Sequence, residues 1–226
     1  MSPAPETTHG FVLRIRPLTD TSLVIHWLTS EHGRLATVAK GARRPSSPFA
    51  GKLDLAFECE FTFQRARRGD LHQLREVRLD KPHATLRTDY AYLTQVAYAI
   101  ALIEQTTETD TPIPEIFELF AGFLNHLPRQ IAQARNIYAF ELKLLTLEGL
   151  EPGGSDSTLP LGALQLIEHL TRESWLNIAN LKGQREDVGR VRKFLEAYLT
   201  QHWGRVARGR SAALDSSDLQ TPMNRG

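Results

Sequence analysis

The sequence predicts an α+β protein, with a five-stranded OB-fold barrel at the N-terminus and an all-helical domain after it. In the first 80 residues, apolar and polar residues alternate with a period of two in several short segments, as in β-strands. From about Pro82 the apolar residues recur at i, i+3, i+4 and i+7, as on one face of a helix. Because the period changes once, we expect a barrel over residues 1–80, a helical domain over 81–211 and a disordered tail over 212–226.

The barrel is predicted from about five short strands that carry no helical pattern. The fourth segment alternates most clearly, with Phe57, Cys59, Phe61 and Phe63 on one side and glutamates on the other. Five strands of this size cannot leave flat edges exposed, so we expect them to close into an OB-fold, the commonest five-stranded barrel that binds nucleic acids. The predicted strands are FVLRIR (11–16), TSLVIHWL (21–28), RLATVAK (34–40), DLAFECEFTF (54–63) and LHQLREV (71–77).

The single cysteine, Cys59, lies in the predicted inward row and is interpreted as a small buried hydrophobe rather than a reactive thiol. One cysteine permits no internal disulfide and no cysteine-based zinc site, which is typical of a reducing, intracellular setting. The N-terminus MSPAPETTHG has no apolar core, so no signal peptide is expected. The apolar run 91–103 is too short to span a bilayer.

Helical periodicity continues to Gly204, where a polar stretch begins. The first helix is expected to carry Leu86, Tyr90, Leu93, Ala97, Ile100 and Ile103 on its buried face. DTPIPE (110–115) resembles a helix start, because proline is tolerated in a first turn. The expected helices cover residues 84–105, about 113–127, 131–148, 162–171 and 186–203.

No motif for covalent chemistry is present, so the sequence gives no positive case for an enzyme and no cofactor is expected. It contains no phosphate-binding loop of the G-x-x-x-x-G-K-[ST] type, no G-x-S-x-G and no H-E-x-x-H. His169 and Glu173 are four residues apart on a predicted helix, a spacing that allows a pair of metal ligands. Because no third ligand is nearby in the sequence, we interpret them as part of a solvated helix face. Glu58 and Glu60 are interpreted as outward carboxylates that keep a sheet face soluble and pair with neighbouring arginines.

Positive charge is concentrated in the predicted barrel, although the formal net charge is only +1. From His32 to Lys52 there are five basic residues and no acidic ones, and further arginines lie at the turn 65–70 and on the first strand. Such cations suit a phosphate backbone, because no carboxylate neutralises them first. The predicted DNA-binding residues are Arg14, Arg16, Arg34, Lys40, Arg43, Arg44, Lys52, Arg67 and Arg68.

Two alternatives stay open for this basic stretch. Basic loops are common on soluble proteins, and such charge alone does not require a nucleic-acid partner. Phe49 stands between Pro48 and Ala50. Its ring either stacks on a base or plugs one end of the barrel. No base-reading pattern is present, so any binding is expected to be independent of DNA sequence.

The segment FVLRIRPLTDTSLVIHWLTSEHGRLATVAKGARRP resembles the N-terminal barrel of the bacterial RecO family of recombination mediators. The resemblance rests on four features in the right order: Arg16–Pro17, the Thr21–Ser22–Leu23 start of strand two, the turn with Glu31 and Gly33, and V-A-K-G-A-R at 38–43. FELKLLTLEGLEP (140–152) is similar to the family's central helix, and HWGRVARGR (202–210) to the basic segment after its last helix.

The resemblance implies a protein that binds single- and double-stranded DNA, anneals complementary strands and helps to load RecA onto DNA coated by single-strand binding protein (SSB). It implies RecR and the acidic C-terminal tail of SSB as partners, and a place at the bacterial nucleoid in the cytoplasm. The SSB tail needs a hydrophobic notch ringed by positive charge. We expect Arg135 and Lys143 at this notch, although both also fit ordinary surface charges of an amphipathic helix.

The sequence departs from the family pattern in two places. Many members carry a four-cysteine zinc module after the central helix, where this chain has EPGGSDSTLPLG (151–162), so we expect no zinc and a shortened region. The family often begins its fourth strand with Pro-Phe, where this chain has Asp54–Leu55. A different class of function also stays open, a protein-interaction adaptor whose helical domain binds partners while the barrel is a scaffold.

Overall fold

The computed structural model describes residues 4–152 and 159–215. The chain divides into two compact units. The barrel unit contains the residues up to Ala84 together with Thr107–Glu118, and the helical unit contains Thr85–Thr106 and the residues from Leu119 onward. The predicted boundary at residue 80 lies close to the end of the first segment of the barrel unit, and the return of Thr107–Glu118 to that unit was not predicted.

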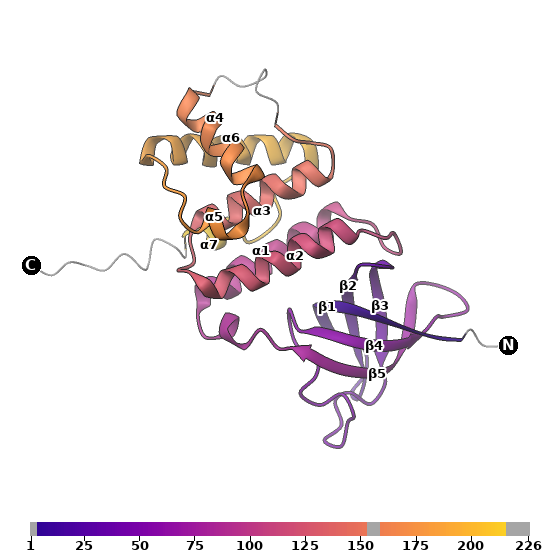
Figure 1. The fold of residues 1–226 in the computed structure, drawn as a ribbon. Coiled ribbons are helices and arrows are strands. Elements are labelled where there is room, and N and C mark those ends of the chain that lie inside the picture. Colours follow the sequence, from indigo (N-terminus) through magenta and orange to yellow (C-terminus); the bar gives the residue numbers. More distant parts are fainter. Residues whose placement is uncertain (1–3, 153–158, 216–226) are drawn as a thin grey trace, which may run out of the picture. The chain divides into compact units, whose positions relative to one another are not determined.

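The described residues of the barrel unit form five strands, which close in the order β1-β2-β3-β5-β4 (Figure 1). All neighbouring strands are antiparallel except β3 and β5, which are parallel over the three pairs from Ala36–Leu71 to Val38–Gln73. This is the predicted α+β architecture with an OB-like barrel. The strands are β1 (Pro5–Pro17), β2 (Leu23–Thr29), β3 (Gly33–Ala39), β4 (Glu58–Gln64) and β5 (Leu71–Lys81).

The interior of the barrel is filled by alternate residues of the strands. Cys59, Phe61 and Phe63 of β4 point inward as predicted, and the ring of Phe61 stacks on Trp27 at a centroid distance of 4.0 Å. Burial, with a smaller contribution from Asp80 and Glu58, raises the pKa of the Cys59 thiol to about 12, which agrees with its interpretation as a buried hydrophobe. The fourth strand begins at Glu58, four residues later than expected.

Phe49 belongs to this interior, with only 6% of its surface exposed. Phe49 lies in the loop between β3 and β4, and its side chain packs against the core residues of the barrel. This agrees with the alternative in which Phe49 plugs one end of the barrel. The expectation that Phe49 stacks on a base is therefore wrong, because a buried ring has no free face to offer.

The segment Thr107–Glu118 is built into the barrel unit. The backbone N–H of Asp110 donates to the carbonyl of Arg34 at 2.9 Å, and the ring of Phe117 lies 4.9 Å from that of Phe11. The close approach requires a glycine at position 33, because a Cβ there would lie 1.8 Å from the carbonyl oxygen of Thr111. Gly33 also has a positive φ of 65°, which a glycine adopts without strain.

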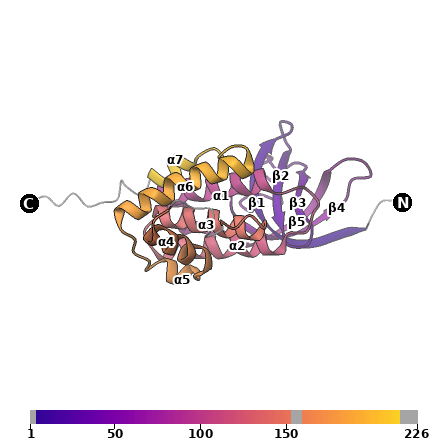
Figure 2. The ribbon, with the colours of Figure 1, turned by 90° about the horizontal axis from the view of Figure 1, so that it is seen from above.

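The described part of the helical unit is organised around α3, which contacts α1, α4, α5 and α7 (Figure 2). Two short 3₁₀ turns, Ala84–Arg87 and Leu127–Arg129, flank α1 and α2. None of the helices in residues 4–152 and 159–215 is long and apolar enough to cross a membrane. The helices are α1 (Tyr90–Thr106), α2 (Pro114–His126), α3 (Ala134–Leu147), α4 (Leu161–Arg172), α5 (Trp175–Ile178), α6 (Arg185–Trp203) and α7 (Arg210–Asp215).

The buried face of α1 differs from the predicted one. Tyr90 is 71% exposed and Ala97 is exposed, whereas Gln95 and Tyr98 are buried. Polar partners explain the difference, because Gln95 Nε2 donates to the carbonyl of Gln133 at 3.0 Å and Tyr98 Oη donates to Glu141 at 2.6 Å. A buried polar group is stable when its hydrogen bonds are made, and the apolar period alone does not reveal such partners.

A buried ion pair fixes α7 in the helical unit. Arg210 donates through Nε and Nη2 to the two carboxylate oxygens of Glu141, at 2.7 and 3.0 Å. Glu141 is fully buried and Arg210 is 6% exposed. The predicted tail was to begin at residue 212, but α7 continues to Asp215, and residues 216–226 lie outside the described residues.

Candidate nucleic-acid interface

The outward side chains of four neighbouring barrel strands form a shallow surface with cations at its edge. Core residues such as Ile25, Trp27 and Leu35 point inward, so the residues between them point outward. A bulge at Leu13 shifts the register of β1, and Arg14 and Arg16 consequently face outward together. One row across β1, β2, β3 and β5 is Arg16, Val24, Val38 and Gln73, and the next is Arg14, His26, Ala36 and Leu71.

The middle of this surface is lined by small side chains, Val24, Ala36 and Val38. Arg16 and Gln73 are three strand spacings apart, which corresponds to about 14 Å. We call this surface, together with the loop 40–57 and the turn 65–70, the basic face. It is the face on which OB-folds bind oligonucleotides, between the β1–β2 and β4–β5 connections.

The loop 40–57 supplies most of the cations of the basic face. Pro17, Leu23 and Ala39 lie in register, so Lys40 follows β3 at the end of the sheet where β1 ends and β2 begins. Arg43 fastens the loop to the β1–β2 connection, since its Nη1 donates to the carbonyl of Thr19 at 3.2 Å. Within the described residues, the exposed side chains of Lys40 and Arg44 make no ion pair, and neither does the half-buried side chain of Lys52.

A cavity of about 320 Å³ connects this loop with the turn 65–70. Lys40, Arg65 and Arg67 line the cavity together with Val38, Leu71 and Gln73. Arg67 and its neighbour Arg68 are exposed at the tip of the turn. Lys40 and Arg67, which are 27 positions apart in the sequence, thereby line one cavity. Leu71 and Gln73 were not among the predicted residues.

Two arginines near the basic face are committed to the fold. Arg34, a predicted DNA-binding residue, donates through Nε to Thr107 Oγ1 at 2.8 Å and so holds the returning segment. Arg65 contacts Glu6 at 2.8 Å and Asp110 at 3.3 Å. A guanidinium held inside the unit has fewer N–H groups to offer a phosphate, so Arg34 is the weakest of the nine candidates.

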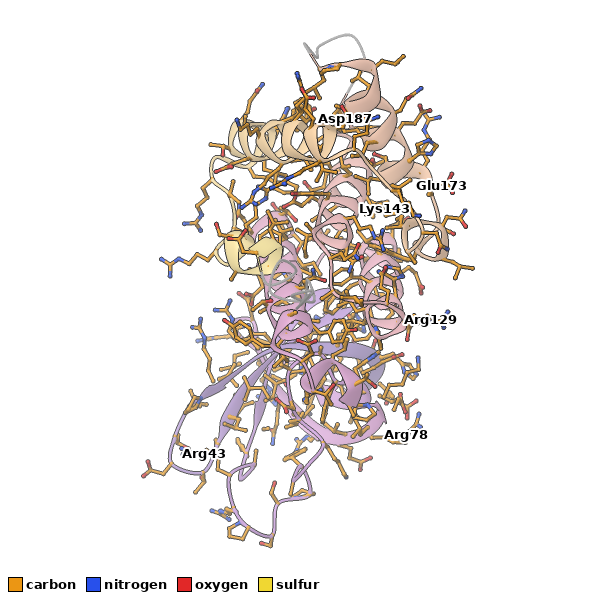
Figure 3. All side chains as sticks on the ribbon, turned by 90° about the vertical axis from the view of Figure 1, so that its left-hand side faces the viewer. Arg43, Arg78, Arg129, Lys143, Glu173 and Asp187 are labelled. Carbon is orange, nitrogen blue, oxygen red and sulfur yellow. The ribbon has the colours of Figure 1, made fainter. Side chains whose placement is uncertain are left out.

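The opposite side of the barrel also carries charged side chains, but these are paired with one another. Arg78 lies 3.2 Å from Glu60 and 2.7 Å from Asp80, and Lys81 lies 2.9 Å from Glu58. The Arg78–Glu60 contact lowers the pKa of Glu60 and raises that of Arg78. The interpretation of Glu58 and Glu60 as outward partners of basic residues is confirmed. Figure 3 shows Arg43 and Arg78 on opposite sides of the barrel, and we call the second side the paired face.

In the helical unit, the two predicted partner-binding residues are tied to backbone carbonyls. Lys143 Nζ donates to the carbonyls of Thr171 and Glu173 at 2.7 and 2.8 Å, at the end of α4 (Figure 3). Arg135 Nη1 donates to the carbonyl of Leu181 at 2.6 Å, and burial lowers the pKa of both side chains. Each of these cations therefore stabilises the end of a helix or loop.

Arg135 lines a cavity that Lys143 does not line. The cavity measures about 500 Å³ and has an apolar wall that includes Tyr138, Leu166 and Leu170, with Arg135 and Lys182 at its charged part. Lys182 is exposed and was not predicted. Lys182 was not predictable from the sequence, because the cavity is formed by helices that are distant in the chain.

His169 and Glu173 lie 3.8 Å apart on an exposed helix surface, as the interpretation without a metal expected. Among residues 4–152 and 159–215, no group of three or more histidine, cysteine, aspartate or glutamate side chains is arranged to hold a metal ion. The stretch for which zinc was not expected, 151–162, falls partly on residues 153–158, which lie outside the described residues.

Family models match both parts of the chain. Residues 1–83 match the model described as "Recombination protein O N terminal", and residues 87–158 match "Recombination protein O C terminal". The chain belongs to the RecO family. The N-terminal match contains all nine predicted DNA-binding residues, and the C-terminal match contains Arg135 and Lys143.

Curated proteins that carry the name "DNA repair protein RecO" are similar to part of the chain. The chain is 28% identical to the protein of Pelobacter propionicus over 148 residues, which is 66% of this chain and 60% of the relative. It is 30% identical to that of Alkaliphilus metalliredigens over 146 residues, 64% and 58% of the two chains. For Actinobacillus pleuropneumoniae serotype 3 the values are 32% over 144 residues, 62% and 57%. The match therefore spans less than two thirds of each relative's length.

Proposed function

We propose that this member of the RecO family is a DNA repair and recombination mediator that binds single- and double-stranded DNA without sequence preference. It anneals complementary strands and assists the loading of RecA onto SSB-coated DNA. The observation that carries the proposal is the basic face, where Lys40, Arg44 and Lys52 have no carboxylate partner among residues 4–152 and 159–215. The names of the relatives support the same class of function.

The electrostatics of the basic face explain how such a protein works without covalent chemistry. A phosphate backbone carries about one charge per 1.7 Å of duplex axis, and each cation that binds it releases counterions. Cations with no internal partner make this exchange without losing an ion pair. The same neutralisation lets two like-charged strands approach each other, so annealing follows from binding.

Replacing Lys40, Arg43 and Arg44 by alanine tests the proposal. We expect DNA affinity to fall by on the order of 10²-fold at about 0.1 M salt, and the slope of log affinity against log salt to fall by about two to three. The loss is expected to be equal for unrelated sequences, since phosphates and not bases are contacted. Fluorescence anisotropy with labelled single strands and duplexes, titrated across salt, measures both quantities.

The matched control replaces Arg78 and Lys81 by alanine, which removes two cations from the paired face. We expect less than about a twofold change in affinity, because their charges are already neutralised by Glu58, Glu60 and Asp80. Equal losses in both variants contradict the proposal and point to net charge alone. A strand-annealing assay with and without SSB is expected to fail for the basic-face variant and succeed for the control.

We also propose that the cavity beside Arg135 receives the acidic C-terminal tail of SSB, with its apolar tip against Tyr138, Leu166 and Leu170. The exposed ammonium of Lys182 takes the role expected of Lys143, whose donors are already used. Contact with RecR stays a prediction from the family resemblance. A Lys182→Glu variant is expected to bind an acidic, apolar-tipped peptide at least about tenfold more weakly.

The exposed Lys193 of α6 provides the control, since it does not line the cavity. Lys193→Glu changes the net charge equally and is expected to leave peptide binding within about twofold. Equal weakening by both variants overturns the proposed site. If peptide binding is strong and the basic-face variant binds DNA normally, the adaptor alternative, in which the barrel is a scaffold, replaces the mediator.

A further inference from the structure

The cavity between the end of β3 and the turn 65–70 differs chemically from the rest of the basic face. Elsewhere the face presents exposed cations on loops, which suit any phosphate backbone. The cavity adds apolar and amide groups to the cations, in a hollow of about 320 Å³. This volume is at the lower end of the range of ligand pockets, which begins at about 300 Å³.

The unusual member of the cavity is Leu71, the first residue of β5. Its side chain is 41% exposed although it lies among cations and amides. An exposed leucine on its own needs no explanation, but here it forms an apolar wall of a charged hollow. Phe49 is buried in the barrel, so it does not provide a stacking surface for a base. Leu71 is a large, exposed apolar side chain that the basic face offers in its place.

The polar groups that line the cavity with Leu71 include the ammonium of Lys40 and the amides of Gln64 and Gln73. Lys40 is exposed, and no carboxylate neutralises it within the described part of the chain. Gln73 lies in the neighbouring row of the same strand, and its amide has both donor and acceptor atoms. Gln64, which pairs with Gln73 across β4 and β5, is held by a hydrogen bond from Arg75.

We infer that this cavity binds one unpaired nucleotide of a DNA strand, with the base against Leu71 and the phosphate at Lys40. The inference rests on the proposed function and names which form of DNA the site prefers. A base inside a duplex is stacked and paired, and bringing it into a pocket costs the free energy of flipping it out. A single strand avoids this cost. The cavity therefore favours single strands, whereas the loop cations bind both forms.

The test replaces Leu71 by alanine in the full chain. Affinity for a single-stranded oligonucleotide is expected to fall about fivefold, since a base–side-chain contact is lost. Affinity for a blunt duplex of the same length is expected to stay within about twofold, because the cations are intact. Leu18→Ala is the matched control, since Leu18 is an exposed leucine of the same unit that does not line the cavity.

A second measurement uses the unchanged protein and a strand in which abasic sites replace the bases. If the cavity takes a base, the abasic strand binds about fivefold more weakly than the normal strand, and Leu71→Ala removes the difference. Equal binding of both strands overturns the inference. Equal losses of single-strand and duplex affinity in Leu71→Ala also overturn it, as does the same loss in Leu18→Ala.

Failure of this inference is distinguishable from failure of the proposed function. If Leu71→Ala leaves the ratio of single-strand to duplex affinity unchanged while the triple alanine variant of the loop loses binding, the mediator stands and the nucleotide pocket falls. If the triple variant binds DNA normally, the proposed function falls, and the pocket falls with it.

Discussion

The exposed loop cations of the basic face and the cations that hold the helical unit together are the same residue types in opposite physical states. In the barrel, Lys40 and Arg44 are exposed and make no ion pair within the described residues. In the helical unit, Arg135 and Lys143 donate to partly buried backbone carbonyls, and Arg210 donates to a buried carboxylate. The comparison teaches that the partners of a cation, and not its charge, decide whether its removal changes binding or stability.

The difference follows from what each cation leaves behind when it is removed. An exposed cation is replaced by water, and its loss has little effect on folding. A buried cation that satisfies carbonyls or a carboxylate leaves those groups without a partner in a medium that solvates them poorly. Stability and DNA affinity should therefore separate between the two units.

The largest expected effect belongs to Arg210. Its replacement by alanine leaves the fully buried carboxylate of Glu141 without its bidentate partner. We expect the free energy of unfolding to fall by about 3–5 kcal/mol, as for other broken buried pairs. DNA affinity per folded molecule is expected to stay within about twofold, because the basic face is untouched. Urea unfolding followed by circular dichroism measures the first quantity.

Arg192 is the matched control for Arg210, because it also pairs with α7. Its Nη2 lies 3.0 Å from Asp215, but the two side chains are 42% and 55% exposed. Arg192→Ala is expected to cost at most about 1 kcal/mol. If the two variants are equally destabilised, the separation between buried and exposed cations does not hold in this unit.

The strands and helices with a clear apolar periodicity were predictable from the sequence. The alternation of Phe57, Cys59, Phe61 and Phe63 identified β4 and its inward row, and the change of period identified the helices. The return of Thr107–Glu118 to the barrel was not predictable, because it depends on long-range contacts such as that between Phe117 and Phe11. The burial of Gln95 and Tyr98 was missed for the same reason, since their partners lie on other helices.

The candidate site was predictable as a composition and not as a geometry. A stretch with five cations and no acidic residue pointed to the loop after β3, and its exposed cations support that interpretation. The sequence did not separate Arg34, which is bound to Thr107, from Lys40, which is available. It also gave no reason to select Leu71, because the cavity appears only when β3 and β5 pair in parallel.

A smaller loss of stability is expected when Lys143 of the helical unit is replaced. Lys143→Met keeps the length of the side chain but removes the ammonium that donates to Thr171 and Glu173 at the end of α4. We expect a loss of about 1–3 kcal/mol, because two carbonyls lose a charged donor near a helix C-terminus. Thermal unfolding of the full chain measures the change.

Lys182→Met is the matched control for Lys143→Met, since Lys182 is exposed and lines the cavity proposed for the SSB tail. It is expected to change stability by less than about 0.5 kcal/mol and to weaken peptide binding. Lys143→Met is expected to lower stability and to leave peptide binding unchanged. Lys143, which donates to backbone carbonyls, then has a structural role, and Lys182, which lines the cavity, has a binding role. If Lys143→Met weakens peptide binding without loss of stability, its ammonium belongs to the binding site, and the contacts to Thr171 and Glu173 do not define its role.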